Sequence, residues 1–129
     1  RENDLLTTLN AKSHRITIEV WDNAEVDGDT ISVLLNDRYV LFGHALTKRK
    51  ERIVIDLPSN YNILEFVAHN EGRVAPNTAS CTVNAGYGKK ELLIRTSNEK
   101  NTTVEINYEP KLSRKLMRYY EDHPLEDPD

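Results

Sequence analysis

The sequence predicts an all-β protein, an antiparallel β-sandwich of the jelly-roll or Greek-key kind. Short runs of alternating apolar and polar residues recur along the chain, and turn-forming residues separate them. Helical periodicity is almost absent before residue 110. Short strands at regular spacing are typical of two packed antiparallel sheets rather than of alternating strands and helices.

The first strand patterns lie in the N-terminal third of the chain. Residues 14–21 alternate between polar and apolar side chains, as expected of a half-buried strand. Asn36-Asp37 is a tight-turn dipeptide between two apolar runs. We therefore expect residues 30–42 to form a β-hairpin.

The same pattern continues to the end of the predicted domain. Residues 43–50 carry no clear pattern, and Pro110 is expected to end the sandwich. Strands are expected over five further segments, which are residues 51–57, 62–69, 79–85, 91–96 and 102–108.

These patterns divide the chain into three segments. Residues 1–13 are expected to be a lead-in with at most a short edge strand, and residues 14–110 to be the sandwich. Residues 111–129 form a C-terminal tail. Its first part has the apolar spacing of a short amphipathic helix, with an irregular segment as the alternative. Its acidic end, which contains prolines, is expected to be disordered.

Composition narrows the class of protein. The 129 residues fit one domain with a core, and the net charge of -4 argues against nucleic acid as a partner. No apolar run approaches the roughly 18 residues of a membrane-spanning helix. No signal peptide is visible, and because the chain begins at Arg1 we expect a processed product or a fragment. The single cysteine, Cys81, excludes an internal disulfide and is expected to be buried.

An acidic loop at residues 21–30 is the most distinctive stretch of the sequence. Its four carboxylates, with no cation among them, fall within eight residues and belong to Asp22, Glu25, Asp27 and Asp29. Oxygen-bearing side chains at alternate positions resemble the first half of an EF-hand loop. The position that would need a bidentate glutamate is Leu34, and strands flank the loop, so an EF-hand is excluded.

A second long loop, near residues 70–78, could complete a site with the first. Calcium takes six to eight oxygen ligands, more than one such loop supplies. The predicted site is either a calcium site or a loop-to-loop hydrogen-bond cluster. Two further readings stay open, a purely structural turn and a contact with a partner or ligand. The candidate residues are Asp22, Asp27, Asp29, Asn70, Glu71 and Asn77.

No catalytic residue is predicted. The four histidines have no pairwise spacing typical of zinc sites, and His69 is best placed if a site exists, although a satisfied strand-end histidine is the expected role. Common nucleophile and nucleotide motifs are absent from the sequence. Trp21 is expected to hold the acidic loop in place rather than to stack on a sugar ring.

Two loop motifs resemble those of a known group of domains. Residues 20–33, VWDNAEVDGDTISV, resemble a WDNG-x-x-DGD motif, and residues 70–79 resemble an N-x-G-x-x-PPNTA motif. Both motifs are found together in uncharacterised β-sandwich domains of bacterial secreted and cell-envelope proteins. Ala24 and Ala75 depart from the pattern, where glycine and proline are usual.

The resemblance implies an extracytoplasmic bacterial protein, which is periplasmic, outer-membrane associated or secreted. We expect a non-catalytic interaction or accessory module whose partner is an envelope protein or a glycan. One alternative is a small carbohydrate-active or hydrolase-like domain that uses Asp27, Asp29 and Glu71. The other is a purely structural domain. Calcium is the one cofactor considered, and the oligomeric state is not predicted.

Overall fold

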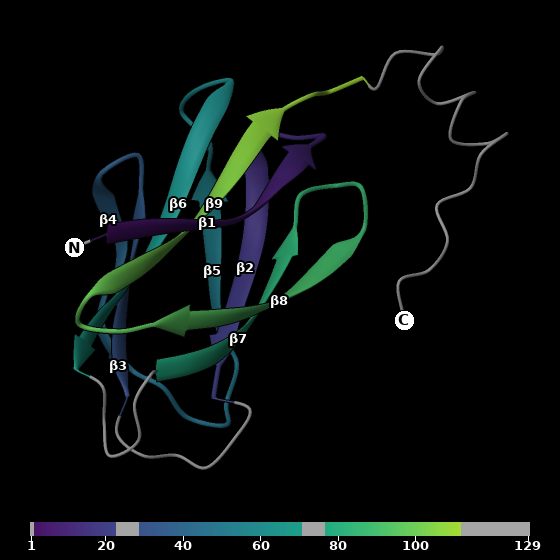
Figure 1. The fold of residues 1–129 in the computed structure, drawn as a ribbon. Helices are drawn as coiled ribbons and strands as arrows, with labels where there is room; N and C mark the ends of the chain where they lie inside the picture. Colours follow the sequence, from purple (N-terminus) through teal and green to yellow (C-terminus); the bar gives the residue numbers. More distant parts are fainter. Residues whose placement is uncertain (1, 23–28, 71–76, 112–129) are drawn as a thin grey trace, which may run out of the picture.

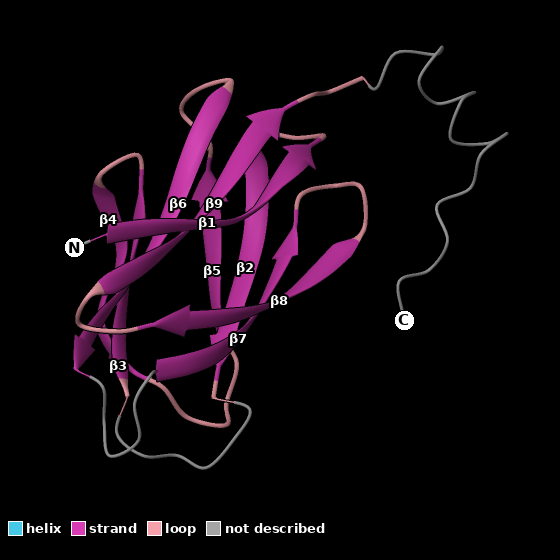
Figure 2. Cartoon of the chain, viewed as in Figure 1, coloured by secondary structure: helices cyan, strands magenta, loops and turns pink. Residues whose placement is uncertain are grey.

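The protein is a β-sandwich of two packed sheets (Figure 1), which confirms the predicted fold class. The computed structural model describes residues 2–22, 29–70 and 77–111. Within these ranges every regular element is a strand (Figure 2). The strands are β1 (Glu2–Ala11), β2 (Arg15–Trp21), β3 (Thr30–Leu35), β4 (Arg38–Ala45), β5 (Glu51–Asp56), β6 (Tyr61–Asn70), β7 (Asn77–Asn84), β8 (Lys89–Thr96) and β9 (Lys100–Tyr108).

The topology brings together strands that are distant in sequence. One sheet has the order β1-β9-β6-β3-β4 and the other the order β5-β2-β7-β8. The strands of the antiparallel pair β3–β6 lie, in sequence, between the strands of the antiparallel pair β2–β7. The chain therefore wraps around itself as in a jelly roll. The pair β1–β9 is parallel and departs from the predicted antiparallel pattern.

The N-terminal segment differs most from the sequence-based prediction. Residues 2–11 form a ten-residue edge strand rather than a lead-in, so the sandwich begins at Glu2 and not at residue 14. Leu9 packs against the core and Ala11 is buried. A register shift between Leu5 and Thr7 interrupts the alternation, and most β1 side chains are exposed. The period-2 signal that reveals a half-buried strand is therefore weak here.

The predicted hairpin is present as β3 and β4. Asn36 and Asp37 have φ angles of 48° and 68°, and two consecutive positive φ angles are what a type I′ hairpin turn requires. β4 continues to Ala45, three residues beyond the predicted end, because the pairing with β3 resumes after register shifts on both sides of Val33.

The core lies between the two sheets and draws on both. Inward-facing positions of β2, β7 and β8 meet those of β3, β6 and β9. Cys81 is buried and free, as predicted, and burial raises the pKa of its thiol to about 12. The largest fully buried side chains include Ile16, Ile18, Ile31, Leu64, Phe66, Ile94 and Ile106.

The predicted tail helix falls on residues 111–120, and all of these except Lys111 lie outside the described residues. In the part of the chain that is described, no helix has the length and apolar character needed to cross a membrane.

Candidate functional site

Two carboxylates of the acidic loop are placed by the structure, one at each end of the loop. Asp22 follows β2 and Asp29 precedes β3, and their side chains are only 2% and 3% exposed. The backbone N–H of Asp22 donates to the Thr47 carbonyl at 2.7 Å, and the backbone N–H of Leu46 donates to the Asp29 carbonyl at 2.9 Å. Both ends of the loop are thus attached to the same short segment after β4.

The second loop leaves from the same end of the sandwich. β6 ends at Asn70, which pairs with Thr30 at the start of β3. β7 begins at Asn77, and Ser80 on that strand pairs with Trp21 at the end of β2. The strand ends that bound the two loops are therefore neighbours, which is the arrangement that a joint site would need.

The rest of the predicted joint site lies outside the described residues. This applies to Asp27 and Glu71, and to the side chains of Asn70 and Asn77. Over residues 2–22, 29–70 and 77–111, no group of three histidine, cysteine, aspartate or glutamate side chains is arranged to hold a metal ion. The calcium site and the loop-to-loop hydrogen-bond cluster stay predictions.

His69 is a satisfied strand-end histidine, as the sequence led us to expect. Its Nε2 is hydrogen-bonded to the Ser32 hydroxyl, and that hydroxyl also accepts a 2.9 Å bond from the backbone N–H of Gly43. The edge of the Phe42 ring packs on the imidazole, with ring centres 5.1 Å apart. Ser32 is fully buried, whereas His69 is exposed.

An exposed apolar surface covers the outer side of the five-stranded sheet. Strand register places Tyr39, Leu34, Glu65, Thr103 and Leu5 in one row across all five strands. Tyr39 is 58% and Phe42 is 66% exposed, and their rings meet edge to face at 4.9 Å. We call this surface the apolar outer face and define it by Leu5, Leu34, Tyr39, Phe42 and Ile63.

Acidic side chains interrupt the apolar outer face. Glu65 accepts a 3.1 Å hydrogen bond from the Asn101 amide. Glu105 accepts bonds from the Tyr61 hydroxyl at 2.8 Å and the Thr8 hydroxyl at 2.9 Å, and the first of these raises the pKa of Tyr61. Both carboxylates line a cavity of about 380 Å³ together with Leu5 and Ile63.

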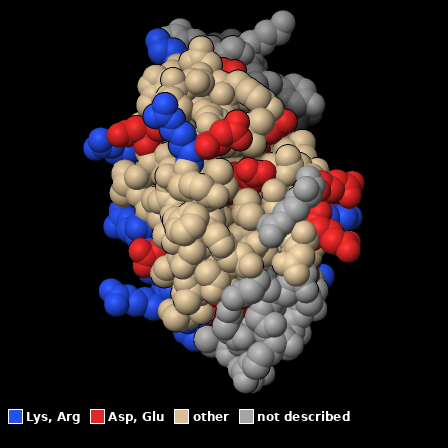
Figure 3. Space-filling model, turned by 90° about the vertical axis from the view of Figure 1, so that its left-hand side faces the viewer, with Lys and Arg blue, Asp and Glu red and all other residues tan. Residues whose placement is uncertain are grey.

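The charge distribution can be followed in Figure 3. The side of the molecule on which β4 and the N-terminus lie is mostly uncharged, with acidic side chains across its middle and most basic ones along one margin. In the sequence, Glu65 and Glu105 are simply two carboxylates within strand patterns that lie far apart in the chain. Their meeting on one surface depends on the pairing of β6 with β9, which joins residues about 40 positions apart in the chain.

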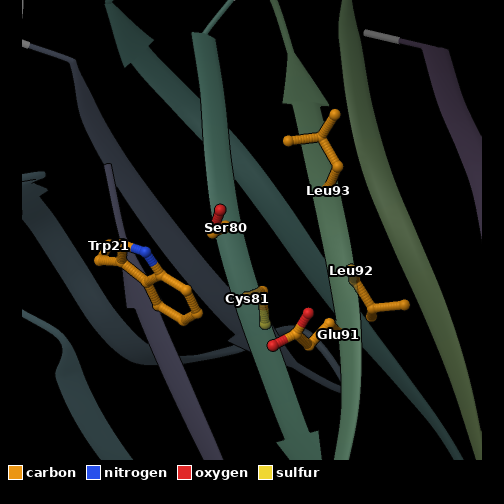
Figure 4. Close-up of a pocket in the computed structure, with 6 residues that line it drawn as sticks. All are labelled: Trp21, Ser80, Cys81, Glu91, Leu92 and Leu93. Atoms are coloured by element: carbon orange, nitrogen blue, oxygen red, sulfur yellow. The ribbon is translucent and has the colours of Figure 1, made fainter. Parts of the chain in front are cut away.

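The outer side of the four-stranded sheet carries Trp21. The indole is half-buried beside Ser80 and Leu93, and the Lys50 ammonium lies 4.5 Å from the ring centre. Figure 4 shows the ring of Trp21 reaching from β2 toward β7, and the carboxylate of Glu91 reaching toward β7 from β8. Trp21 thus packs over the sheet and under Lys50, and it helps to line a cavity of about 340 Å³.

In comparisons with known proteins, no family model, no curated protein and no solved structure matches this chain.

Proposed function

We propose that the protein is a non-catalytic interaction module of a bacterial secreted or cell-envelope protein, and that the apolar outer face binds a protein partner. The observation that carries this proposal is the uneven distribution of exposed apolar side chains. Among the residues that the structure describes, eight large hydrophobic ones are exposed, and only Val54 and Leu93 of these belong to strands of the four-stranded sheet. Exposed apolar side chains gathered on one face, with polar groups beside them, are typical of a protein–protein contact surface.

The acidic groups define the chemistry of the partner. Glu65 and Glu105 lie among the apolar side chains of this surface. A complementary partner presents apolar side chains with lysine or arginine between them, because opposite charges across an interface select the partner and speed its association. The extracytoplasmic location is part of the proposal and is supported by the two loop motifs.

The test compares two matched variants as bait in a cross-linking pull-down from bacterial envelope extract. Phe42→Ser removes an aromatic ring from the apolar outer face, and Val54→Ser removes another exposed apolar group, from the other sheet. We expect Phe42→Ser to reduce the amount of the captured protein strongly and Val54→Ser to leave it unchanged. The captured protein is then purified, and its affinity for both variants is measured in solution.

Two results would overturn the proposal. One is equal capture by the wild-type chain and the Phe42→Ser variant. The other is hydrolysis of an envelope glycan or peptide by the purified protein that a Glu71→Gln change abolishes, which would favour the hydrolase-like alternative.

A further inference from the structure

We propose a second binding site, for a pyranose ring of a neutral glycan, on the outer side of the four-stranded sheet between Trp21 and β8. This site lies on a different sheet from the apolar outer face. The inference goes beyond the proposed function and does not depend on it.

Strand pairing builds the site on three neighbouring strands. Trp21 on β2 pairs with Ser80 on β7, and Ser80 pairs with Leu93 on β8. Residues directly opposite each other in antiparallel strands point to the same face, so these three side chains form one row across the sheet. Leu93 is 45% exposed and Trp21 is half-buried, which leaves apolar surface open to a ligand at both ends of the row.

The polar groups of the cavity complement hydroxyl groups. The Ser80 hydroxyl both donates and accepts hydrogen bonds, and the Glu91 carboxylate accepts them. Figure 4 shows the Trp21 ring and the Glu91 carboxylate turned toward the same stretch of β7 from opposite sides. Together with Leu93 these groups line a cavity of about 340 Å³.

The charges favour an uncharged ligand. Glu91 supplies one negative charge, and the Lys50 ammonium, 4.5 Å from the centre of the Trp21 ring, supplies one positive charge beside it. A charged ligand would gain from one of these groups and be repelled by the other. Hydroxyl groups can accept from the ammonium and donate to the carboxylate at the same time.

A pyranose has the required combination of surfaces. One side of the ring presents C–H groups that pack on Leu93 and on the part of the Trp21 ring that Lys50 leaves uncovered, and its edge presents hydroxyl groups to Ser80 and Glu91. Small-ligand sites usually combine aromatic and apolar walls with a few convergent polar groups. A wholly apolar ligand would leave the polar groups of the cavity without hydrogen bonds, which is unfavourable.

The site has a built-in reporter, because Trp21 is the sole tryptophan of the chain. The full chain is titrated with cellopentaose, maltopentaose and penta-N-acetylchitopentaose, and with oligogalacturonate as an anionic comparison. Tryptophan emission and the heat of binding are recorded. We expect at least one neutral oligosaccharide to change the emission saturably, with a matching heat, and oligogalacturonate to bind more weakly.

Two variants on β8 test the assigned contacts while the reporter is kept. Glu91→Gln removes the charged acceptor and Leu93→Ala removes apolar contact surface. Each is expected to weaken binding of the active oligosaccharide by about tenfold. The control is Val54→Ala, an exposed apolar residue of the same sheet that does not line the cavity, which should leave the affinity unchanged.

Three results would overturn the inference. They are no saturable response to any neutral probe, unchanged affinity in both β8 variants, and tighter binding of oligogalacturonate. If the glycan site is disproved, the proposed protein-binding function and its test with Phe42→Ser still stand, because the two sites share no residue.

Discussion

Asn62 joins three separate parts of the sandwich through one buried amide. Its side chain is fully buried on β6. Nδ2 donates to the carbonyls of Ser59 at 2.8 Å and Ile106 at 3.2 Å. Oδ1 accepts from the Asn36 amide at 2.9 Å and from the Ser59 backbone at 3.2 Å. All four hydrogen-bonding positions of the amide are used, so the turn before β6, the β3–β4 hairpin and β9 are held together.

We predict that Asn62→Leu destabilises the protein by about 2–4 kcal/mol, because it leaves buried donors and acceptors without partners. The free energy of unfolding is measured by urea titration. The control is Ile63→Val at the next, more exposed position, where a change below about 1 kcal/mol is expected. Equal midpoints for wild type and Asn62→Leu would contradict this role of the amide.

The role of Asn62 could not be predicted from the sequence. The alternating pattern predicts the strand at residues 62–69, but it does not show that a polar side chain at its start faces inward. The partners of Asn62 lie 26 and 44 positions away in the chain. The burial of Asp22 and Asp29 could not be predicted either. The sequence shows that both lie among other acidic residues, but it does not show that they are buried or that their backbone groups bond to residues 46–47.

At the scale of elements, eight of the nine strands were predicted and one was not. Strands such as β2 and β6 bury alternate side chains against the opposite sheet, and that burial produces the alternating sequence signal. β4 has no fully buried position and was predicted instead from its apolar run and the Asn36-Asp37 turn. β1 is an edge strand, joined to the sheet mainly by backbone pairing with β9. Backbone hydrogen bonds place no requirement on the side chains of a strand. The sequence of an exposed parallel edge strand therefore resembles that of an irregular polar segment.

The turn between β7 and β8 supports the β1–β2 connection. Gly86 and Gly88 both have φ near +100°, a region that side chains other than glycine rarely adopt. A Cβ atom on Gly86 would lie 2.7 Å from Cβ of Lys12, whereas one on Gly88 would meet open space. The backbone N–H of Lys12 also donates to the Ala85 carbonyl at 2.7 Å.

We predict that Gly88→Ala costs about 1–3 kcal/mol from backbone strain alone. Gly86→Ala should cost more, since the same strain is joined by a clash with Lys12. Thermal unfolding of the two single variants measures the difference, and each variant is the other's control. Equal losses of stability in the two variants would contradict the clash, because the β1–β2 and β7–β8 connections would then be able to move apart at no cost.

At the scale of the whole molecule, the two sheets present different outer surfaces. The four-stranded sheet carries paired charges, among them Arg15 with Asp56 at 3.0 Å and Lys89 with Glu19 at 3.3 Å. The five-stranded sheet carries the apolar outer face. A sandwich with two unlike faces offers separate surfaces for separate partners, in keeping with the proposed role of an interaction module.

The calcium hypothesis makes a prediction about the whole molecule. A ligand that binds only the folded state stabilises it, by about 1.4 kcal/mol at tenfold excess over the dissociation constant. Melting curves in calcium and in EDTA should then differ, and Asp27→Asn should remove the difference. Identical curves for the wild-type chain would contradict the calcium hypothesis and leave the hydrogen-bond cluster, the structural turn and the partner or ligand contact as explanations of the two loops.

The buried thiol of Cys81 makes stability depend on alkaline pH. Burial raises its pKa to about 12, above the value of about 8.5 expected in the unfolded chain. A raised pKa in the folded state means that the folded state holds its proton more tightly. This contribution is complete below the unfolded pKa and is lost as pH rises toward the folded pKa, by about 1.4 kcal/mol per pH unit.

The prediction is tested with Cys81→Ala, which removes the titrating group. Near pH 7 the variant should be less stable than wild type by about 1–3 kcal/mol, because a small cavity replaces the sulfur. Above pH ~9 the difference in unfolding free energy between wild type and variant should decrease as the pH rises, since only the wild type loses the thiol contribution. Urea titrations of both proteins at several pH values give the two curves. Lysines and tyrosines titrate in both proteins and affect both curves of stability against pH alike. If the two curves run parallel, the thiol ionises as readily in the folded protein as in the unfolded chain, which would contradict the prediction.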